Sequence, residues 1–149
     1  MTNIPPRVTP EQVSAGLRAF FATASKWKLT DDQAMTLLGQ PAKATFLGWK
    51  RGDCKSVSLT LDLATRLSFV LGIFKALEII YQTPELADRW VTAPNRAIGG
   101  ETAIQRMMTG QIADLAAVRD YLDSIRGGQP ECVRTIRRSR TVGCHFCVV

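Results

Sequence analysis

The sequence has 149 residues, of which 46% are hydrophobic and 21% are charged, and its formal net charge is +6. This length suits one domain or two small ones, and the hydrophobic share is sufficient for a buried core. The most apolar stretch, 67–81, contains Lys75 and Glu78 and is too short to span a bilayer. Residues 1–30 lack a basic start followed by an apolar core, and the four cysteines do not form the framework of a disulfide-rich domain. We therefore expect a cytoplasmic protein that makes no membrane contact.

Positive charge is concentrated at the two ends of the chain. The net charge is +4 over residues 1–60, −1 over residues 61–130 and +3 over residues 131–149. A basic first part suits contact with a polyanion, and a nearly neutral middle suits a different partner. The same charge is also ordinary for solubility, so charge alone leaves both interpretations open.

Helix-start signals recur in the first half of the chain, and strand signals are almost absent. The segments TPEQ (9–12) and TDDQ (30–33) have the pattern of capping boxes, which predicts one helix over 10–26 and another starting at 31. Gly39 is suited to end the second helix, and Pro41 is expected to begin a third that Gly52 ends. The sequence thus predicts a helix-turn-helix over residues 30–52.

The second half begins with a long predicted helix, about 59–81, whose broad apolar stripe places it at the centre of the core. The residues of that stripe are Leu63, Leu67, Val70, Leu71, Phe74, Leu77 and Ile80. A helix over 84–90, an irregular loop over 92–101 and two helices over 102–109 and 112–125 follow. The polar segment 53–58 marks a boundary. We predict an all-α protein with a helix-turn-helix region (1–57), a helical domain (58–128) and a basic tail (129–149) that is loosely held or packs on a partner.

The last helix of the predicted helix-turn-helix is a candidate for insertion into the DNA major groove. The side chains that we expect to contact DNA are Lys43, Thr45, Lys50, Arg51 and Lys55. The first two lie near the start of the helix, where base contacts are usual, and the next two are better placed for phosphates. Phe46 and Trp49 are assigned to packing. A plain helical hairpin with solvated lysines has the same pattern, so the pattern leaves DNA binding open.

No residue pattern indicates catalysis or a metal site. His145 is the only histidine, and no carboxylate in the tail is placed to orient it. Cys144 and Cys147 form a Cys-x-x-Cys pair, but the adjacent His145 is poorly spaced as a further ligand, so we interpret the pair as accidental. The sequence has no phosphate-binding loop and no nucleophile elbow. We expect a protein that is not an enzyme and uses no cofactor and no metal.

The loop between the middle helices contains an unusual set of residues. These residues are Trp90, Pro94, Asn95, Gly99 and Gly100. Proline removes a backbone donor, the glycines permit conformations closed to other residues, and asparagine can bond to nearby backbone. Tryptophan supplies a large apolar anchor with one donor. The loop is either a connection between two helices or a rigid surface for a partner protein, and the residues alone do not decide between them.

Three segments, 66–81, 87–110 and 112–128, resemble the toxin-binding domain of the Xre/MbcA/ParS antitoxins. The specific part is the series from Trp90 through Pro94 and Asn95 to Gly99 and Gly100. The resemblance covers about residues 58–128 and extends in less detail over 30–52. It implies an antitoxin that occludes the active site of a RES-domain toxin, a protein with an ADP-ribosyltransferase-like fold that consumes NAD. It also implies repression of the antitoxin's own operon through operator DNA.

The domain that resembles the toxin binder has polar or aromatic residues suited to contact a toxin. These candidates are Arg66, Asn95, Arg96, Tyr121 and Arg126. We expect Trp90 mainly in the core, and a pre-ordered loop would lose less entropy on binding. Because a paired helix-turn-helix usually binds a two-fold site, we expect a homodimer and a larger hetero-oligomer with the toxin.

Two alternatives remain. Relatives in the family end near the Gly-Gly pair at 127–128, whereas this chain continues to residue 149, so the tail either helps to plug the toxin's pocket or is a neutral extension. The second alternative concerns the whole protein, which would then be a stand-alone dimeric helix-turn-helix transcription regulator without a toxin partner. A RES-domain gene beside the gene for this chain distinguishes the antitoxin from the regulator.

Overall fold

The computed structural model describes residues 9–54 and 60–127, and the regular structure in these ranges is helical. The elements are α1 (Pro10–Lys26), α2 (Asp31–Leu37), α3 (Lys43–Lys50), α4 (Leu61–Ile80), α5 (Pro84–Thr92), the 3₁₀ helix η1 (Arg96–Ile98), α6 (Ala103–Met107) and α7 (Ile112–Arg126). The prediction of an all-α protein is confirmed. No helix in the described ranges is long and apolar enough to cross a membrane. Lys55, most of the predicted boundary at 53–58, and the tail 129–149 with its Cys-x-x-Cys pair lie outside the described residues.

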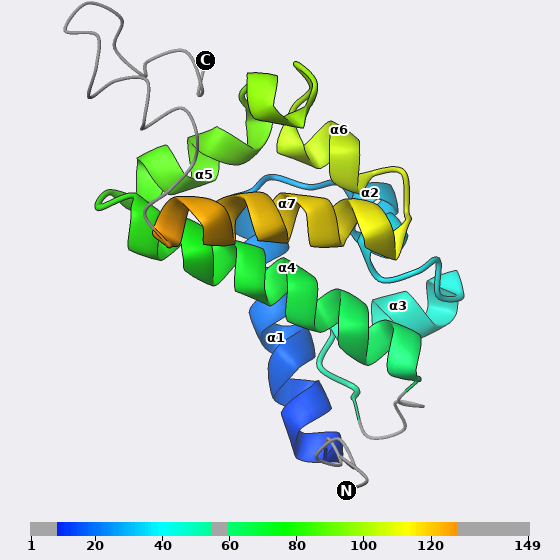
Figure 1. Ribbon diagram of the computed structural model, residues 1–149. Coiled ribbons are helices and arrows are strands. Elements are labelled where there is room, and N and C mark those ends of the chain that lie inside the picture. Colours follow the sequence, from blue (N-terminus) through cyan, green and yellow to red (C-terminus); the bar gives the residue numbers. More distant parts are fainter. Residues whose placement is uncertain (1–8, 55–59, 128–149) are drawn as a thin grey trace, which may run out of the picture.

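Helix α4 is the centre of the fold. It packs along α7 on one side and crosses α1 on the other, and α5 and α6 complete the layer that contains α7 (Figure 1). Ile73 and Ala76 of α4 are fully buried, although both lie outside the predicted stripe, and Leu71 and Phe74 are only partly buried. The prediction of one apolar stripe was therefore wrong in detail. A helix covered on two sides buries two faces, so its apolar residues do not follow one line.

Three helices begin with the same reciprocal cap. Thr9 with Gln12, Thr30 with Gln33 and Thr102 with Gln105 each form a capping box. In each box the threonine hydroxyl accepts from the backbone N–H of the glutamine, and the glutamine side chain accepts from the backbone N–H of the threonine. Each box satisfies two backbone donors that a helix start otherwise leaves without partners. The first two boxes were predicted from the sequence.

The turn between α2 and α3 differs from its prediction. Helix α3 begins at Lys43 and not at Pro41, and its N-cap residue Ala42 offers no side-chain cap. The reason is that Gly39 (φ 86°) and Gln40 (φ 59°) both adopt left-handed conformations, so Pro41 and Ala42 are needed to redirect the chain. Gly39 also lies against the first turns of α4. A Cβ atom there would stand 2.8 Å from Asp62 Oδ2 and 2.9 Å from Arg66 Nε.

Replacing Gly39 with alanine tests how closely this turn packs on α4. Gly52 is the matched control, because it has a similar φ of 92° but no atom within 4 Å of its would-be Cβ. We expect Gly52→Ala to lower the free energy of unfolding by about 1 kcal/mol, the backbone cost alone. Gly39→Ala adds a clash with a buried side chain and should cost about 2–3 kcal/mol. Urea unfolding followed by circular dichroism measures both, and equal losses would show that the turn is not tightly packed.

Candidate functional site

The loop between α5 and α6 is closed by hydrogen bonds around Asn95. Its backbone N–H donates to the carbonyl of Glu101 (2.9 Å), and its carbonyl accepts from the N–H of Gly100 (2.9 Å). Its side-chain Oδ1 accepts from the N–H of Ala97 (2.9 Å) and so caps η1. The loop projects beyond α5 and α6 in Figure 1. One buried asparagine therefore holds an exposed loop in a single shape.

The glycine pair completes the loop through backbone conformation. Gly99 and Gly100 have φ values of 79° and 84°, in the left-handed region that glycine adopts most easily. No atom lies within 4 Å of a Cβ built on either residue. The glycines are thus required for the turn and not for a close approach. An isolated antiparallel bridge between Pro94 and Thr102 closes the base of the loop.

Trp90 anchors this loop to the core. It is 1% exposed, and its ring stacks on that of Tyr121 from α7, with centroids 6.3 Å apart and planes at 14°. The expected core position of Trp90 agrees with this burial. Its indole Nε1–H is buried and has no hydrogen-bond partner. Buried donors are normally paired, so this one requires an explanation.

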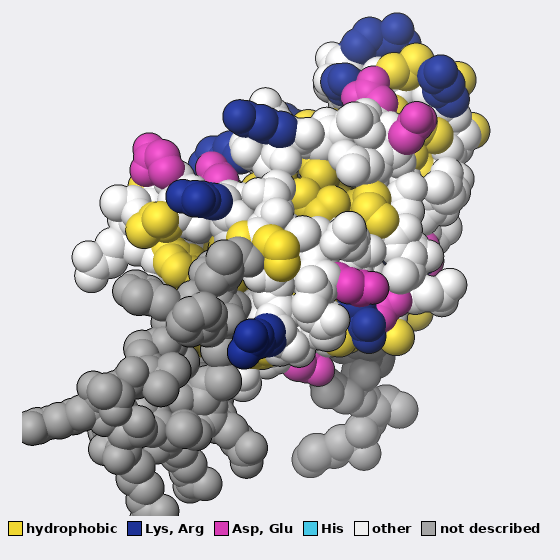
Figure 2. Space-filling view, turned by 90° about the horizontal axis from the view of Figure 1, so that it is seen from above, with side chains coloured by type: hydrophobic (Ala, Val, Ile, Leu, Met, Phe, Trp, Pro, Cys, Tyr) yellow, Lys and Arg dark blue, Asp and Glu magenta, His cyan; other side chains and the backbone are white. Residues whose placement is uncertain are grey.

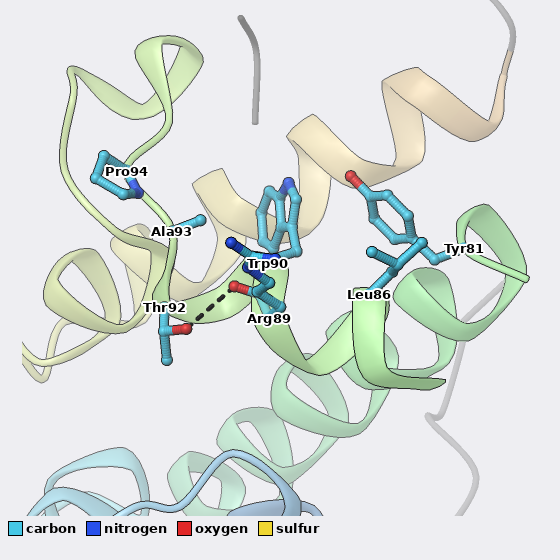
Figure 3. Close-up of a pocket in the computed structure, with 7 residues that line it drawn as sticks. All are labelled: Tyr81, Leu86, Arg89, Trp90, Thr92, Ala93 and Pro94. Carbon is cyan, nitrogen blue, oxygen red and sulfur yellow. Dashed lines mark hydrogen bonds between the residues drawn. The ribbon is translucent and has the colours of Figure 1, made fainter. Parts of the chain in front are cut away.

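A pocket of about 460 Å³ lies beside Trp90, between α5 and the start of the loop (Figure 3). Its lining residues are Tyr81, Leu86, Arg89, Trp90, Thr92, Ala93 and Pro94. The Thr92 hydroxyl donates to the carbonyl of Arg89 (3.1 Å). Within residues 9–54 and 60–127, Arg89 forms no ion pair. No sequence pattern gave Arg89 a role, and its only signal was a cation directly before the tryptophan.

One of the apolar side chains that line this pocket is exposed on the molecular surface. Leu86, which lines the pocket, is 53% exposed. Figure 2, seen from above, shows hydrophobic side chains in several small groups, with Lys, Arg, Asp and Glu side chains between them. Leu86 thus offers apolar area close to the charged Arg89 on the same helix, a combination that protein interfaces also use.

The structure corrects two of the predicted toxin contacts. Arg66 is 9% exposed and Asn95 is 1% exposed, so neither presents its polar group to a partner. Arg66 Nε lies 2.8 Å from Asp62 Oδ2, and its Nη1 donates to the carbonyl of Gly110 (2.8 Å). Both residues hold segments of the domain together. Their polarity reflects a buried hydrogen-bonding role, which the sequence pattern does not distinguish from a surface role.

The other three predicted toxin contacts lie on different elements. Arg96 is exposed on η1, and Arg126 is exposed at the end of α7, where its Nη1 lies 3.5 Å from Asp123 Oδ1. Tyr121 is partly buried by its stacking on Trp90. The two arginines remain accessible to a partner, and Tyr121 offers only part of its surface.

Helix α3 separates basic and packing residues as the sequence suggested. Phe46 and Trp49 are buried, and Phe46 meets Phe21 of α1 edge-on with centroids 5.5 Å apart. The four predicted DNA contacts that lie in the described ranges are exposed, and they are Lys43, Thr45, Lys50 and Arg51. Lys50 Nζ lies 2.7 Å from Asp31 Oδ1, and both side chains are about half exposed. This ion pair partly neutralises the basic face, although a surface pair is weak enough to be exchanged for a phosphate.

These features define a helical protein-binding module with a rigid exposed loop and an adjoining pocket. In the described part of the chain, no group of three or more His, Cys, Asp or Glu residues is placed to hold a metal ion. The sequence profile of the antitoxin Xre/MbcA/ParS C-terminal toxin-binding domain matches residues 76–128, which include the pocket, the loop and α7. The protein y4oB of Sinorhizobium fredii (strain NBRC 101917 / NGR234), described as uncharacterized, is 41% identical over 117 residues, which cover 78% of this chain and 88% of that protein. No solved structure shows significant similarity to the chain.

The chain belongs to the Xre/MbcA/ParS family of antitoxins, and the predicted resemblance is confirmed. The family assigns it an antitoxin role with a toxin as its partner. All five residues of the loop motif and all lining residues of the pocket fall within the matched segment.

Replacing Arg66 with methionine tests its structural role. The substitution keeps much of the apolar stem but leaves the Gly110 carbonyl without its donor and Asp62 without its partner. We expect a loss of about 2–3 kcal/mol in the free energy of unfolding. Arg126→Met is the control and should change stability by less than about 0.5 kcal/mol, because it removes only a surface ion pair. Urea unfolding measures both effects. A similarly small loss at both positions would show that Arg66 is not needed for stability and would make it a candidate toxin contact again.

Proposed function

We propose that this protein neutralises a RES-domain toxin by covering the active site in which that toxin consumes NAD. The toxin-binding part is the domain over residues 58–128, centred on the loop after Trp90. The observation that carries the proposal is the coincidence of the family's toxin-binding profile with an exposed loop held rigid from inside. The RES identity of the toxin rests on the family resemblance.

Steric occlusion fits the physical properties of this surface. The loop is already ordered by Asn95 and the glycine pair, so little conformational entropy remains to be lost on binding. The exposed Leu86 at the pocket supplies apolar area whose removal from water on binding is favourable. Such a surface blocks an enzyme by shape and affinity and requires no reacting group of its own.

A second activity, repression of the operon, is proposed for the helix-turn-helix over residues 30–52. Helix α3 supports it by burying its aromatic residues and exposing Lys43, Thr45, Lys50 and Arg51. A homodimer would place two copies of α3 on a two-fold operator, and the toxin would extend it to a hetero-oligomer. The exposed basic face of α3 also suits a stand-alone dimeric regulator, and the identity of the neighbouring gene separates the two cases. Either function belongs in the cytoplasm.

Co-expression with the protein encoded by the neighbouring gene tests the antitoxin proposal. We expect the neighbour alone to deplete cellular NAD, and the wild-type chain to bind it and to restore NAD. Replacing Arg96 and Arg126 with glutamate should lower affinity by roughly tenfold or more through charge repulsion at the contact surface. Lys75→Glu, an exposed charge reversal on α4, is the matched control. A neighbour that depletes NAD but is not bound by the wild-type chain would refute the proposal.

Operator binding at several salt concentrations tests the DNA proposal. Lys43→Ala with Arg51→Ala should weaken binding to the operon's promoter and lower the salt slope by about 1 for each phosphate that is no longer bound. Both side chains are exposed and form no ion pair within the described residues, so the substitutions should leave the fold intact. Lys75→Ala serves as the control for a general reduction of positive charge. An unchanged slope would remove α3 from the DNA interface.

A further inference from the structure

We propose that Asp31 lowers the affinity of this chain for DNA by competing with DNA phosphate for Lys50. The Asp31 carboxylate binds the Lys50 ammonium group while no DNA is present, and a phosphate takes its place when α3 meets the double helix. This inference rests on the DNA-binding activity proposed above and names a residue that limits it.

The ion pair joins the two helices of the helix-turn-helix. Lys50 Nζ, at the end of α3, lies 2.7 Å from Asp31 Oδ1, at the start of α2. The two side chains are 48% and 53% exposed, so both also reach solvent. A pair this exposed is weak, because water and salt compete for both charges. Asp31 therefore holds Lys50 loosely enough for another anion to replace it.

Lys50 differs in this respect from the other cations of α3. Lys43 and the C-cap residue Arg51 are also exposed, but neither forms an ion pair within the described residues. These two offer their full charge to a phosphate, whereas Lys50 must first leave Asp31. The ion pair thus selectively reduces the contribution of one of the three cations.

DNA phosphate is the stronger competitor for Lys50. B-DNA carries one negative charge about every 1.7 Å along its axis, and a lysine that neutralises a phosphate releases condensed counterions. A single surface carboxylate offers neither that charge density nor that gain in entropy. The exchange still has a cost, because the ion pair is lost and the freed carboxylate stays close to the phosphate that Lys50 now binds. Both effects lower the affinity for DNA.

The cost applies to DNA of any sequence, because phosphate contacts carry no sequence information. The base contacts expected of Lys43 and Thr45 come from the other end of α3 and do not involve the ion pair. Asp31 therefore weakens binding to the operator and to unrelated DNA by the same factor.

Asp32 is a matched control from the same turn. Both carboxylates are exposed in the first turn of α2, between the Thr30 and Gln33 side chains that form the capping box. Asp32 forms no ion pair within the described part of the chain. Replacing either residue with asparagine removes one negative charge from the positive end of the helix. The contact with Lys50 is what distinguishes the two substitutions.

The test measures binding of the full chain to a duplex of its own promoter and to a duplex of unrelated sequence, by fluorescence anisotropy at several salt concentrations. We expect Asp31→Asn to tighten binding to both duplexes by roughly twofold to fivefold at low salt, and Asp32→Asn by less. In a Lys50→Ala background the two substitutions should have equal effects, because the excess effect of Asp31→Asn requires the lysine. Lys50→Ala alone should lower the salt slope by about 1. Urea unfolding midpoints near that of the wild type show that the variants are folded.

Several results would overturn the proposal while leaving DNA binding itself intact. One is an equal effect of Asp31→Asn and Asp32→Asn in the presence of Lys50, and another is an excess effect of Asp31→Asn that persists without Lys50. An unchanged salt slope for Lys50→Ala would show that Lys50 stays on Asp31 in the complex. Weaker binding by Asp31→Asn would show that Asp31 orients Lys50 for DNA, and tighter binding to the promoter alone would show a role in base recognition. A wild-type chain that binds neither duplex would refute the DNA-binding activity and this inference together.

Discussion

The buried guanidinium of Arg66 connects three segments that are distant in the sequence. It pairs with Asp62 on α4, donates to the carbonyl of Gly110 before α7, and lies under the turn at Gly39. A buried charge must keep its partners, so the positions of all three segments are fixed relative to one another. Gly110 is also close to α2, because a Cβ atom there would stand 3.6 Å from Thr36 Cγ2. Arg66 thus connects the turn between α2 and α3 to α4 and to the segment before α7, in addition to the apolar core that α1 shares with α4.

The contacts of Arg66 link the two parts of the chain to which the two proposed activities are assigned. The turn that sets the direction of α3 rests on the same arginine that positions the turn before α7. Helix α1 packs on α4 as well, so the predicted boundary near residue 55 separates two parts that share a core. A toxin bound at the loop after Trp90 would be carried at a fixed position relative to DNA bound by α3. Rigid coupling of this kind favours a repressor complex in which toxin and operator are held by the same body.

Local chemistry was readable from the sequence, whereas tertiary packing was not. The capping boxes at Thr9 and Thr30 predicted helix starts correctly, because their signal lies within four residues. The burial of Ile73 depends on α4 being covered from two sides, and the late start of α3 depends on a turn shaped against α4. The prediction that Arg66 and Asn95 contact a toxin was wrong for the same reason. The sequence does not show whether a polar side chain finds its hydrogen-bond partners in the protein or in solvent. The pocket beside Arg89 was not predicted, because its walls come from both α5 and the loop.

The motif that identifies the family is mostly a structural one. Trp90 and Asn95 are buried, and Gly99 and Gly100 set a backbone conformation, so these residues build the loop and offer a partner little surface. Recognition of one toxin among several must then come from the exposed residues that the motif holds in place. Arg89, Leu86 and Arg96 are such residues, and each stands directly beside a motif position or on the same short helix. A shared scaffold with changeable neighbours allows each antitoxin to keep the fold and match its own toxin, because specificity depends on differences between alternative contacts.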